Sequence, residues 1–171
     1  GQQYETLQAA VDAVQGSGTI ELTSSIALSD QVTIDSGKTI ILDMNGETLS
    51  IGFSDSSKNL IVNNGTLTIT GDGTFDATEA TSYKGFINNY GTLTVENGTF
   101  QIADKAMTVH LRNQDGGKAV INGGTFSGGA TIVRSFEGSN TTITGGSFTN
   151  SVYPAVDVNE ETLITGGIFT N

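Results

Sequence analysis

Apolar and polar residues alternate in short segments along most of the chain, and many segments end at a Gly or Asn pair. Alternation with a period of two predicts β-strands with one buried face, and Gly and Asn favour tight turns between strands. Five segments repeat one phrase: GTLTITGDGTF (65–75), GTLTVENGTF (91–100), GKAVINGGTF (117–126), NTTITGGSF (140–148) and ETLITGGIF (161–169). The chain therefore contains an internal repeat.

Two columns of apolar residues keep nearly one spacing through the repeats. The predicted ladders are Phe75, Phe100, Phe126, Phe148 and Phe169, and Ile69, Val95, Ile121, Ile143 and Ile164. A period of about 20 to 30 residues built from strands indicates a solenoid, in which each turn of chain (a coil) buries its apolar face against the next coil. Leucine-rich repeats need a Leu-dense consensus that is absent, and propeller blades need about 40 residues. We predict an all-β, single-stranded parallel β-helix.

The N-terminal segment follows a different period. Its apolar residues lie at helical spacing: Tyr4, Leu7, Val11 and Val14. Gly16 follows, and glycine is common just after the C-terminus of a helix. We predict that residues 1–17 form an amphipathic α-helix that caps the open end of the solenoid and protects its strand edges.

The remaining chain divides into a less regular and a regular part. Residues 18–59 alternate without the full phrase and predict the first coils, in which Leu49 begins the phenylalanine column. Residues 60–171 predict the regular coils, and all 171 residues form one domain. No cap-like segment follows Phe169, so we expect a longer natural chain of which this sequence is a fragment.

Charge and composition narrow the range of partners. Eighteen acidic against seven basic residues give a net charge of −11, which argues against nucleic-acid binding because that needs clustered cations. No apolar run approaches the roughly 18 to 20 residues needed to cross a bilayer, so membrane insertion is not expected. The absence of cysteine excludes disulfides and thiolate metal sites. We expect a monomer.

The order of segments resembles a known fold family. The helix LQAAVDAV, followed by TIELTSSIAL, QVTIDSGKTIILDMNGETL and an NGGTF turn, resembles the right-handed β-helix of pectate-lyase-like proteins, particularly the repeat regions of large bacterial surface proteins. The resemblance implies a right-handed helix, an extracellular or cell-surface bacterial location, and a polysaccharide or a host or microbial surface protein as partner. Lyases of this group use several Asp on neighbouring coils to hold calcium beside a basic residue.

Acidic residues do not form the columns that such a calcium site needs. Of ten outward positions that flank the best-aligned strand, only Glu96 carries a carboxylate. Most other acids fall in turns, where solvated charges are expected. A calcium ion held by Asp72, Asp76 and Glu79 is the alternative, because calcium prefers six or more converging oxygens. We expect no cofactor.

One cluster of charged residues repeats at the local period. Arg112, Arg134 and Asp157 are separated by 22 and 23 residues, so we predict that they form one ladder. Together with His110, the only histidine, the two guanidinium groups could bind a carboxylate of an acidic glycan. The alternative is that Asp157 and nearby acids neutralise both arginines.

Amide and aromatic residues outside the repeat phrase complete the candidates. We predict a ladder of stacked amides from four residues at equivalent turns: Asn63, Asn64, Asn88 and Asn89. Four aromatic residues lie outside the phenylalanine column and either pack at corners or stack on sugar rings: Tyr83, Tyr90, Phe136 and Tyr153.

Two functional hypotheses follow from these patterns. The first is a non-catalytic surface module that serves as a spacer, an adhesive or a glycan-contacting domain, because no convergent set of titratable groups is present. The second is a polysaccharide-active enzyme, a lyase or a glycoside hydrolase, or a fragment of one, that uses the face near Arg112, Arg134 and Asp157.

Overall fold

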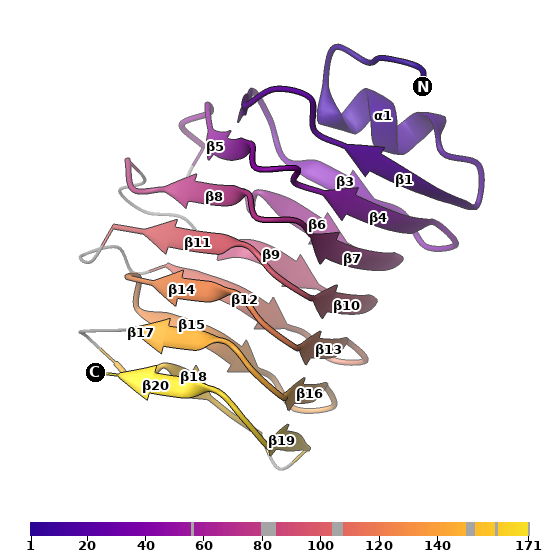
Figure 1. Ribbon diagram of the computed structural model, residues 1–171. Helices are drawn as coiled ribbons and strands as arrows, with labels where there is room; N and C mark the ends of the chain where they lie inside the picture. Colours follow the sequence, from indigo (N-terminus) through magenta and orange to yellow (C-terminus); the bar gives the residue numbers. More distant parts are fainter. Residues whose placement is uncertain (56, 80–84, 104–107, 150–152, 160, 171) are drawn as a thin grey trace.

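The computed structural model describes residues 1–55, 57–79, 85–103, 108–149, 153–159 and 161–170. Within them the chain forms a parallel β-solenoid of about six turns, built from three sheets that run the length of the molecule (Figure 1). The predicted all-β parallel β-helix is therefore confirmed. Tyr83 lies outside the described residues.

Each sheet collects one strand from successive coils. Sheet A contains, in spatial order, β1 (Ser17–Glu21), β4 (Thr39–Asp43), β7 (Thr66–Thr70), β10 (Thr92–Val95), β13 (Lys118–Ile121), β16 (Asn140–Ile143) and β19 (Thr162–Ile164). Sheet B contains β2 (Ile26–Leu28), β5 (Thr48–Ile51), β8 (Thr74–Ala77), β11 (Thr99–Ile102), β14 (Thr125–Ser127), β17 (Ser147–Thr149) and β20 (Ile168–Thr170). Sheet C contains β3 (Val32–Ile34), β6 (Ile61–Asn63), β9 (Gly85–Asn89), β12 (Val109–Asn113), β15 (Thr131–Ser135) and β18 (Val156–Asp157). In each sheet a strand before residue 59 pairs with a strand after residue 60: β4 with β7, β5 with β8, and β3 with β6.

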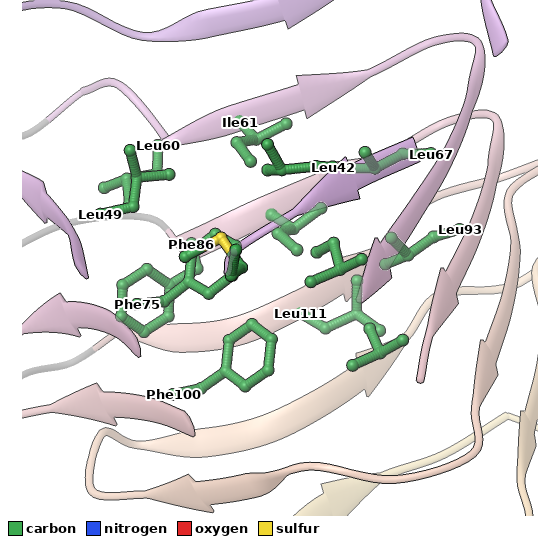
Figure 2. Packing of buried hydrophobic residues seen from close by; sticks show 14 of the residues in the cluster. Leu42, Leu49, Leu60, Ile61, Leu67, Phe75, Phe86, Leu93, Phe100 and Leu111 are labelled. Atoms are coloured by element: carbon green, nitrogen blue, oxygen red, sulfur yellow. The ribbon is translucent and has the colours of Figure 1, made fainter. Parts of the chain in front are cut away.

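Apolar ladders fill the space between the sheets. Phe75, Phe100, Phe126, Phe148 and Phe169 pair in register along sheet B, with neighbouring ring centroids 4.5–5.0 Å apart and nearly parallel. Leu49 pairs with Phe75 and so belongs to this column, as the sequence predicts, but the column begins one coil earlier, at Ile26, which pairs with Leu49. Along sheet A the aliphatic ladder is Ile20, Leu42, Ile69, Val95, Ile121, Ile143 and Ile164. Figure 2 shows Phe75 and Phe100 on one side of this core and Leu67 and Leu93 on the other.

The Gly before each Thr-Phe or Ser-Phe pair has a steric role. Gly98 and Gly124 have φ values of +113° and +96°, a backbone region that residues other than glycine rarely adopt. A Cβ at Gly124 would lie 3.1 Å from the carbonyl oxygen of Gly98 and 3.3 Å from the Phe126 ring. At this turn the backbone lies so close to the backbone of the preceding coil and to the phenylalanine ring that no side chain fits.

In the described part of the chain a single short helix lies over the first coil, which is compatible with the predicted cap (Figure 1). Helix α1 spans Leu7–Ala13, and Thr6 accepts a hydrogen bond from the Ala9 N–H at its N-terminus. The Gln8 side chain accepts from the Thr33 N–H (2.7 Å) and donates to the Thr33 carbonyl (3.1 Å), so it occupies the hydrogen-bonding edge of β3.

The helix is shorter than the apolar spacing predicts. Val14 is already extended and Tyr4 precedes the first turn, so neither belongs to the helix, and Gly16 lies beyond its end. The reason is the Lys38 ammonium, which donates to the carbonyl oxygens of Val11, Asp12 and Val14 at 2.8–3.0 Å. A cation at these carbonyls stabilises the C-terminus without a glycine cap.

A ladder of buried amides runs along sheet C inside the solenoid. Asn63 Nδ2 donates to Asn89 Oδ1 (2.7 Å), Asn89 Nδ2 donates to Asn113 Oδ1 (2.8 Å), and Asn113 Nδ2 donates to Thr141 Oγ1 (2.9 Å). All three asparagines are fully buried, and each also donates to a backbone carbonyl. The predicted ladder is therefore correct for Asn63 and Asn89.

The other two predicted members of the amide ladder were placed wrongly. Asn64 is exposed and Asn88 lies on the outer face of sheet C, because strand alternation turns each neighbour of a buried Asn outward. The missing member is Asn113, which follows Asn89 by 24 residues just as Asn89 follows Asn63 by 26. This recurrence at the repeat period is the sequence signal that identifies Asn113 as a member of the ladder.

Candidate functional site

The predicted charged ladder lies on the outer surface of sheet C. Arg112 in β12 pairs in register with Arg134 in β15, and Arg134 pairs with Asp157 in β18. In β12 and β15 the residues before and after the arginine are buried, so Arg112 and Arg134 point outward, and Asp157 is exposed at the end of β18. Parallel neighbours lie about 4.8 Å apart, which sets the spacing between the two arginine backbones.

A phenylalanine ring holds the two guanidinium groups in place. The Cζ atoms of Arg112 and Arg134 lie 5.2 Å and 5.3 Å from the centroid of the Phe136 ring, within the range of a cation–π interaction. Burial lowers the pKa of the Arg112 guanidinium, and the neighbouring charge of Arg134 lowers it further. Two like charges are thus held side by side on an apolar support, an arrangement that an anion between them would stabilise.

One carboxylate already contacts this pair. Arg134 Nε lies 3.1 Å from Asp157 Oδ2, and both side chains are about half exposed. An exposed ion pair of this kind contributes roughly 0 to 1 kcal/mol, so solvent and ligands compete with it readily. The ion pair between Asp157 and Arg134 is thus one contact of the alternative expected from the sequence, in which acids neutralise the arginines.

Polar and aromatic side chains extend the surface toward the earlier coils. Asn88 Nδ2 donates to the Tyr90 hydroxyl (3.2 Å), and Gln114 Nε2 donates to Asn88 Oδ1 (2.5 Å). Tyr90 is 48% exposed. We call the resulting surface the arginine face; it consists of Asn88, Tyr90, Arg112, Gln114, Arg134, Phe136 and Asp157. Sequence reasoning did not include Gln114 or place Asn88 there.

His110 does not join the arginine face. Its side chain is 1% exposed and packs between Phe86 and Phe126, at ring-centroid distances of 5.4 Å and 5.9 Å. The reason is a local break in alternation, because both His110 and Leu111 are buried in β12. The same break recurs in the neighbouring strands of sheet C, where Phe86 and Ile87 of β9 and Ile132 and Val133 of β15 are also consecutive buried residues.

The environment of His110 keeps its imidazole neutral. Burial lowers its pKa from 6.5 to about 4, although a hydrogen bond to the Gly128 carbonyl opposes this change. Nε2 lies 3.1 Å from that carbonyl oxygen and must carry the proton, whereas Nδ1 is buried without a hydrogen-bond partner. These contacts describe a core residue held away from solvent.

The candidate calcium residues are engaged by neighbouring donors. Asp72 Oδ1 accepts a hydrogen bond from Asn97 Nδ2, and Asp76 Oδ1 accepts from the N–H and hydroxyl of Thr78. In the part of the chain that the structure describes, no three His, Cys, Asp or Glu side chains are grouped closely enough to hold a metal ion. Asp72, Asp76 and Glu79 therefore give no geometry from which to argue a calcium site.

No protein-family model, curated protein or solved structure matches this chain. None of the helical residues described forms a segment long and apolar enough to cross a bilayer.

Proposed function

We propose that the chain is a non-catalytic solenoid module whose arginine face binds an acidic polysaccharide. The observation that supports this most is the pair of guanidinium groups stacked over Phe136 on a chain of net charge −11. A guanidinium group forms two parallel hydrogen bonds with a carboxylate, and a repeating uronic acid chain offers carboxylates in series. In this proposal the module acts outside the cell, on or near a bacterial surface.

The surroundings of the two arginines suit a sugar chain better than a small anion. Tyr90 offers aromatic surface for the apolar face of a sugar ring, and the amides of Asn88 and Gln114 can bond to hydroxyl groups. The face is an open strand surface, so the ligand would lie along several coils instead of entering a pocket. Asp157 acts as an internal competitor that the ligand carboxylate displaces from Arg134.

The test is a comparison of acidic and neutral oligosaccharides of matched length on an immobilised array and by calorimetry. We expect binding of the acidic series only, with at least tenfold weaker affinity in Arg112→Ala and in Arg134→Ala, since a charged hydrogen bond contributes roughly 1.5 to 3 kcal/mol. Lys118→Ala is the matched control, because Lys118 is an exposed cation on sheet A. Arg112→Lys and Arg134→Lys keep the charge and should still bind more weakly than the parent.

Two results would overturn the proposal. Equal losses in Lys118→Ala and the arginine variants would indicate a diffuse charge effect. Silence of the parent chain across acidic glycans would leave the module as a spacer.

A further inference from the structure

Four Asn-Gly pairs lie at turns of the solenoid: Asn45–Gly46, Asn64–Gly65, Asn97–Gly98 and Asn122–Gly123. Glycine carries no side chain, so its backbone nitrogen is the one best able to reach the side chain of a preceding asparagine. The attack of that nitrogen on the side-chain amide is the first step of deamidation. All four asparagines are exposed, so exposure alone does not separate them.

Three of the four asparagines are tied to a carboxylate of the preceding coil. The bonds run from Asn45 Nδ2 to Glu21 Oε1 (3.2 Å), from Asn97 Nδ2 to Asp72 Oδ1, and from Asn122 Nδ2 to both carboxylate oxygens of Glu96 (3.1 Å each). Hydrogen bonds to a charged acceptor are stronger than those between neutral groups. Each of these side chains must therefore break a charge-assisted bond before it can turn toward the following glycine.

Asn64 is not held in this way. Its side chain has no hydrogen-bond partner among the described residues, and it lies with Gly65 in the bend between β6 and β7. The Gly65 N–H donates to Asn63 Oδ1 at 3.2 Å, so a neutral side-chain amide restrains the attacking nitrogen. The Asn64 side chain can therefore rotate toward this nitrogen without breaking a bond to its neighbours.

We propose that Asn64 is a site of spontaneous deamidation and that the carboxylates of the preceding coils protect the other three pairs. The Gly65 backbone nitrogen gives its proton to solvent and attacks Asn64 Cγ. The new N–Cγ bond replaces the Cγ–Nδ2 bond, and Nδ2 takes up a proton and leaves as ammonia. Water then opens the cyclic imide: hydrolysis at Cγ gives aspartate at position 64, and hydrolysis at the backbone carbonyl carbon gives isoaspartate, in which the main chain runs through Cβ and Cγ.

The protecting carboxylates oppose the attack as well as holding the amide. Loss of the glycine N–H proton creates negative charge at the turn, which a neighbouring carboxylate disfavours. Asn122 is held further by Thr144, whose hydroxyl donates to Asn122 Oδ1 (2.8 Å), and Gly98 is buried. We expect Asn64 to react at least about tenfold faster than the asparagine of any other pair.

Modification of Asn64 affects the joint between two coils. The Asn64 N–H donates to the Ile34 carbonyl of the preceding coil at 2.9 Å. Two residues later the Thr66 N–H donates to the Lys38 carbonyl, also at 2.9 Å. An isoaspartate between these bonds lengthens the main chain and disturbs their register. Lys38 also anchors the C-terminal end of α1, so the isoaspartyl form should unfold at a lower urea concentration.

Peptide mapping distinguishes the four pairs, because trypsin releases them in separate peptides, residues 39–58, 59–84, 85–105 and 119–134. One sample of the 171-residue chain is kept folded in mildly alkaline buffer, a second is kept unfolded in urea, and both are mapped over time by mass spectrometry. We expect conversion at Asn64 in the folded chain and comparable conversion at all four pairs in the unfolded chain. Enzymatic methylation of isoaspartate measures the isomerised fraction.

Substitutions test the protecting role directly. Glu96→Ala releases Asn122 and should speed its conversion at least about tenfold while Asn64 is unaffected. Glu137→Ala is the matched control, since it removes an exposed carboxylate at another turn and should change neither rate. Asn64→Gln should abolish conversion in residues 59–84, because the longer side chain would have to close a larger ring.

Three results would each overturn the proposal. The first is an equal rate at all four pairs of the folded chain. The second is no conversion at Asn64 during the time in which the unfolded chain reacts. The third is no acceleration at Asn122 in Glu96→Ala.

Discussion

Acidification is expected to weaken the fold through one side chain, His110. In the folded state burial lowers the pKa of His110 from 6.5 to about 4. In the unfolded chain the imidazole is solvated and returns to its ordinary value. Between pH 6.5 and 4 the unfolded state therefore binds a proton that the folded state rejects, and the free energy of unfolding falls as the pH falls through this window.

The size of this effect follows from the difference between the two pKa values. A difference of about 2.5 between the two pKa values corresponds to about 3 kcal/mol when the pH lies below both values. At pH 5 the same relation gives a loss of about 2 kcal/mol relative to pH 8. This is a substantial part of the roughly 5 to 15 kcal/mol by which domains are stable.

Urea unfolding followed by far-UV circular dichroism at pH 8, 6.5 and 5 measures the effect. His110→Leu is the matched variant, because Leu60 occupies the corresponding inward column in an earlier coil and because leucine removes the unpartnered Nδ1. The parent should lose about 2 kcal/mol more than the variant between pH 8 and 5. Equal losses in the two proteins would refute the reasoning and show that His110 is protonated or solvated in the folded state.

Three further substitutions test the ladders and the cap. Phe126→Ala should lower the free energy of unfolding by about 3 to 5 kcal/mol, since it removes a ring stacked on both sides; a urea-unfolding loss below about 1 kcal/mol would contradict this. Asn89→Ala should cost at least about 2 kcal/mol in the same assay because it leaves buried amide groups of two neighbours unpaired, whereas Asn64→Ala should be nearly neutral. Leu7→Asp should promote association at the N-terminal end, detected by light scattering, and unchanged mass would argue against the capping role.

The repeat phrase was sufficient to predict the register of the core. Identical residues recurring at the coil period must stack when coils stack, so Phe75 to Phe169 and Ile69 to Ile164 could be aligned without any structure. The same logic extends to Leu49 and to the pairing of Arg112 with Arg134. Spacing along the chain thus determines which residues are neighbours between coils.

Spacing does not determine which way a side chain points where alternation breaks. At His110 two consecutive residues turn inward, and alternation fails at the same place in β9 and β15. The end of α1 likewise depends on Lys38, which is 24 residues away from Val14 in the chain. The position of Phe136 beneath both arginines is a third contact set by the folded surface.

NMR mapping of an acidic oligosaccharide on the labelled chain tests the proposed function most directly. We predict that the side-chain Nε–H signals of Arg112 and Arg134 and the side-chain amide of Gln114 shift on titration, while signals from the outer face of sheet A, such as Thr94, stay in place. A neutral oligosaccharide of the same length should move none of them. Shifts confined to sheet A or to β20, or no shifts with any acidic glycan, would contradict the arginine face as a binding site.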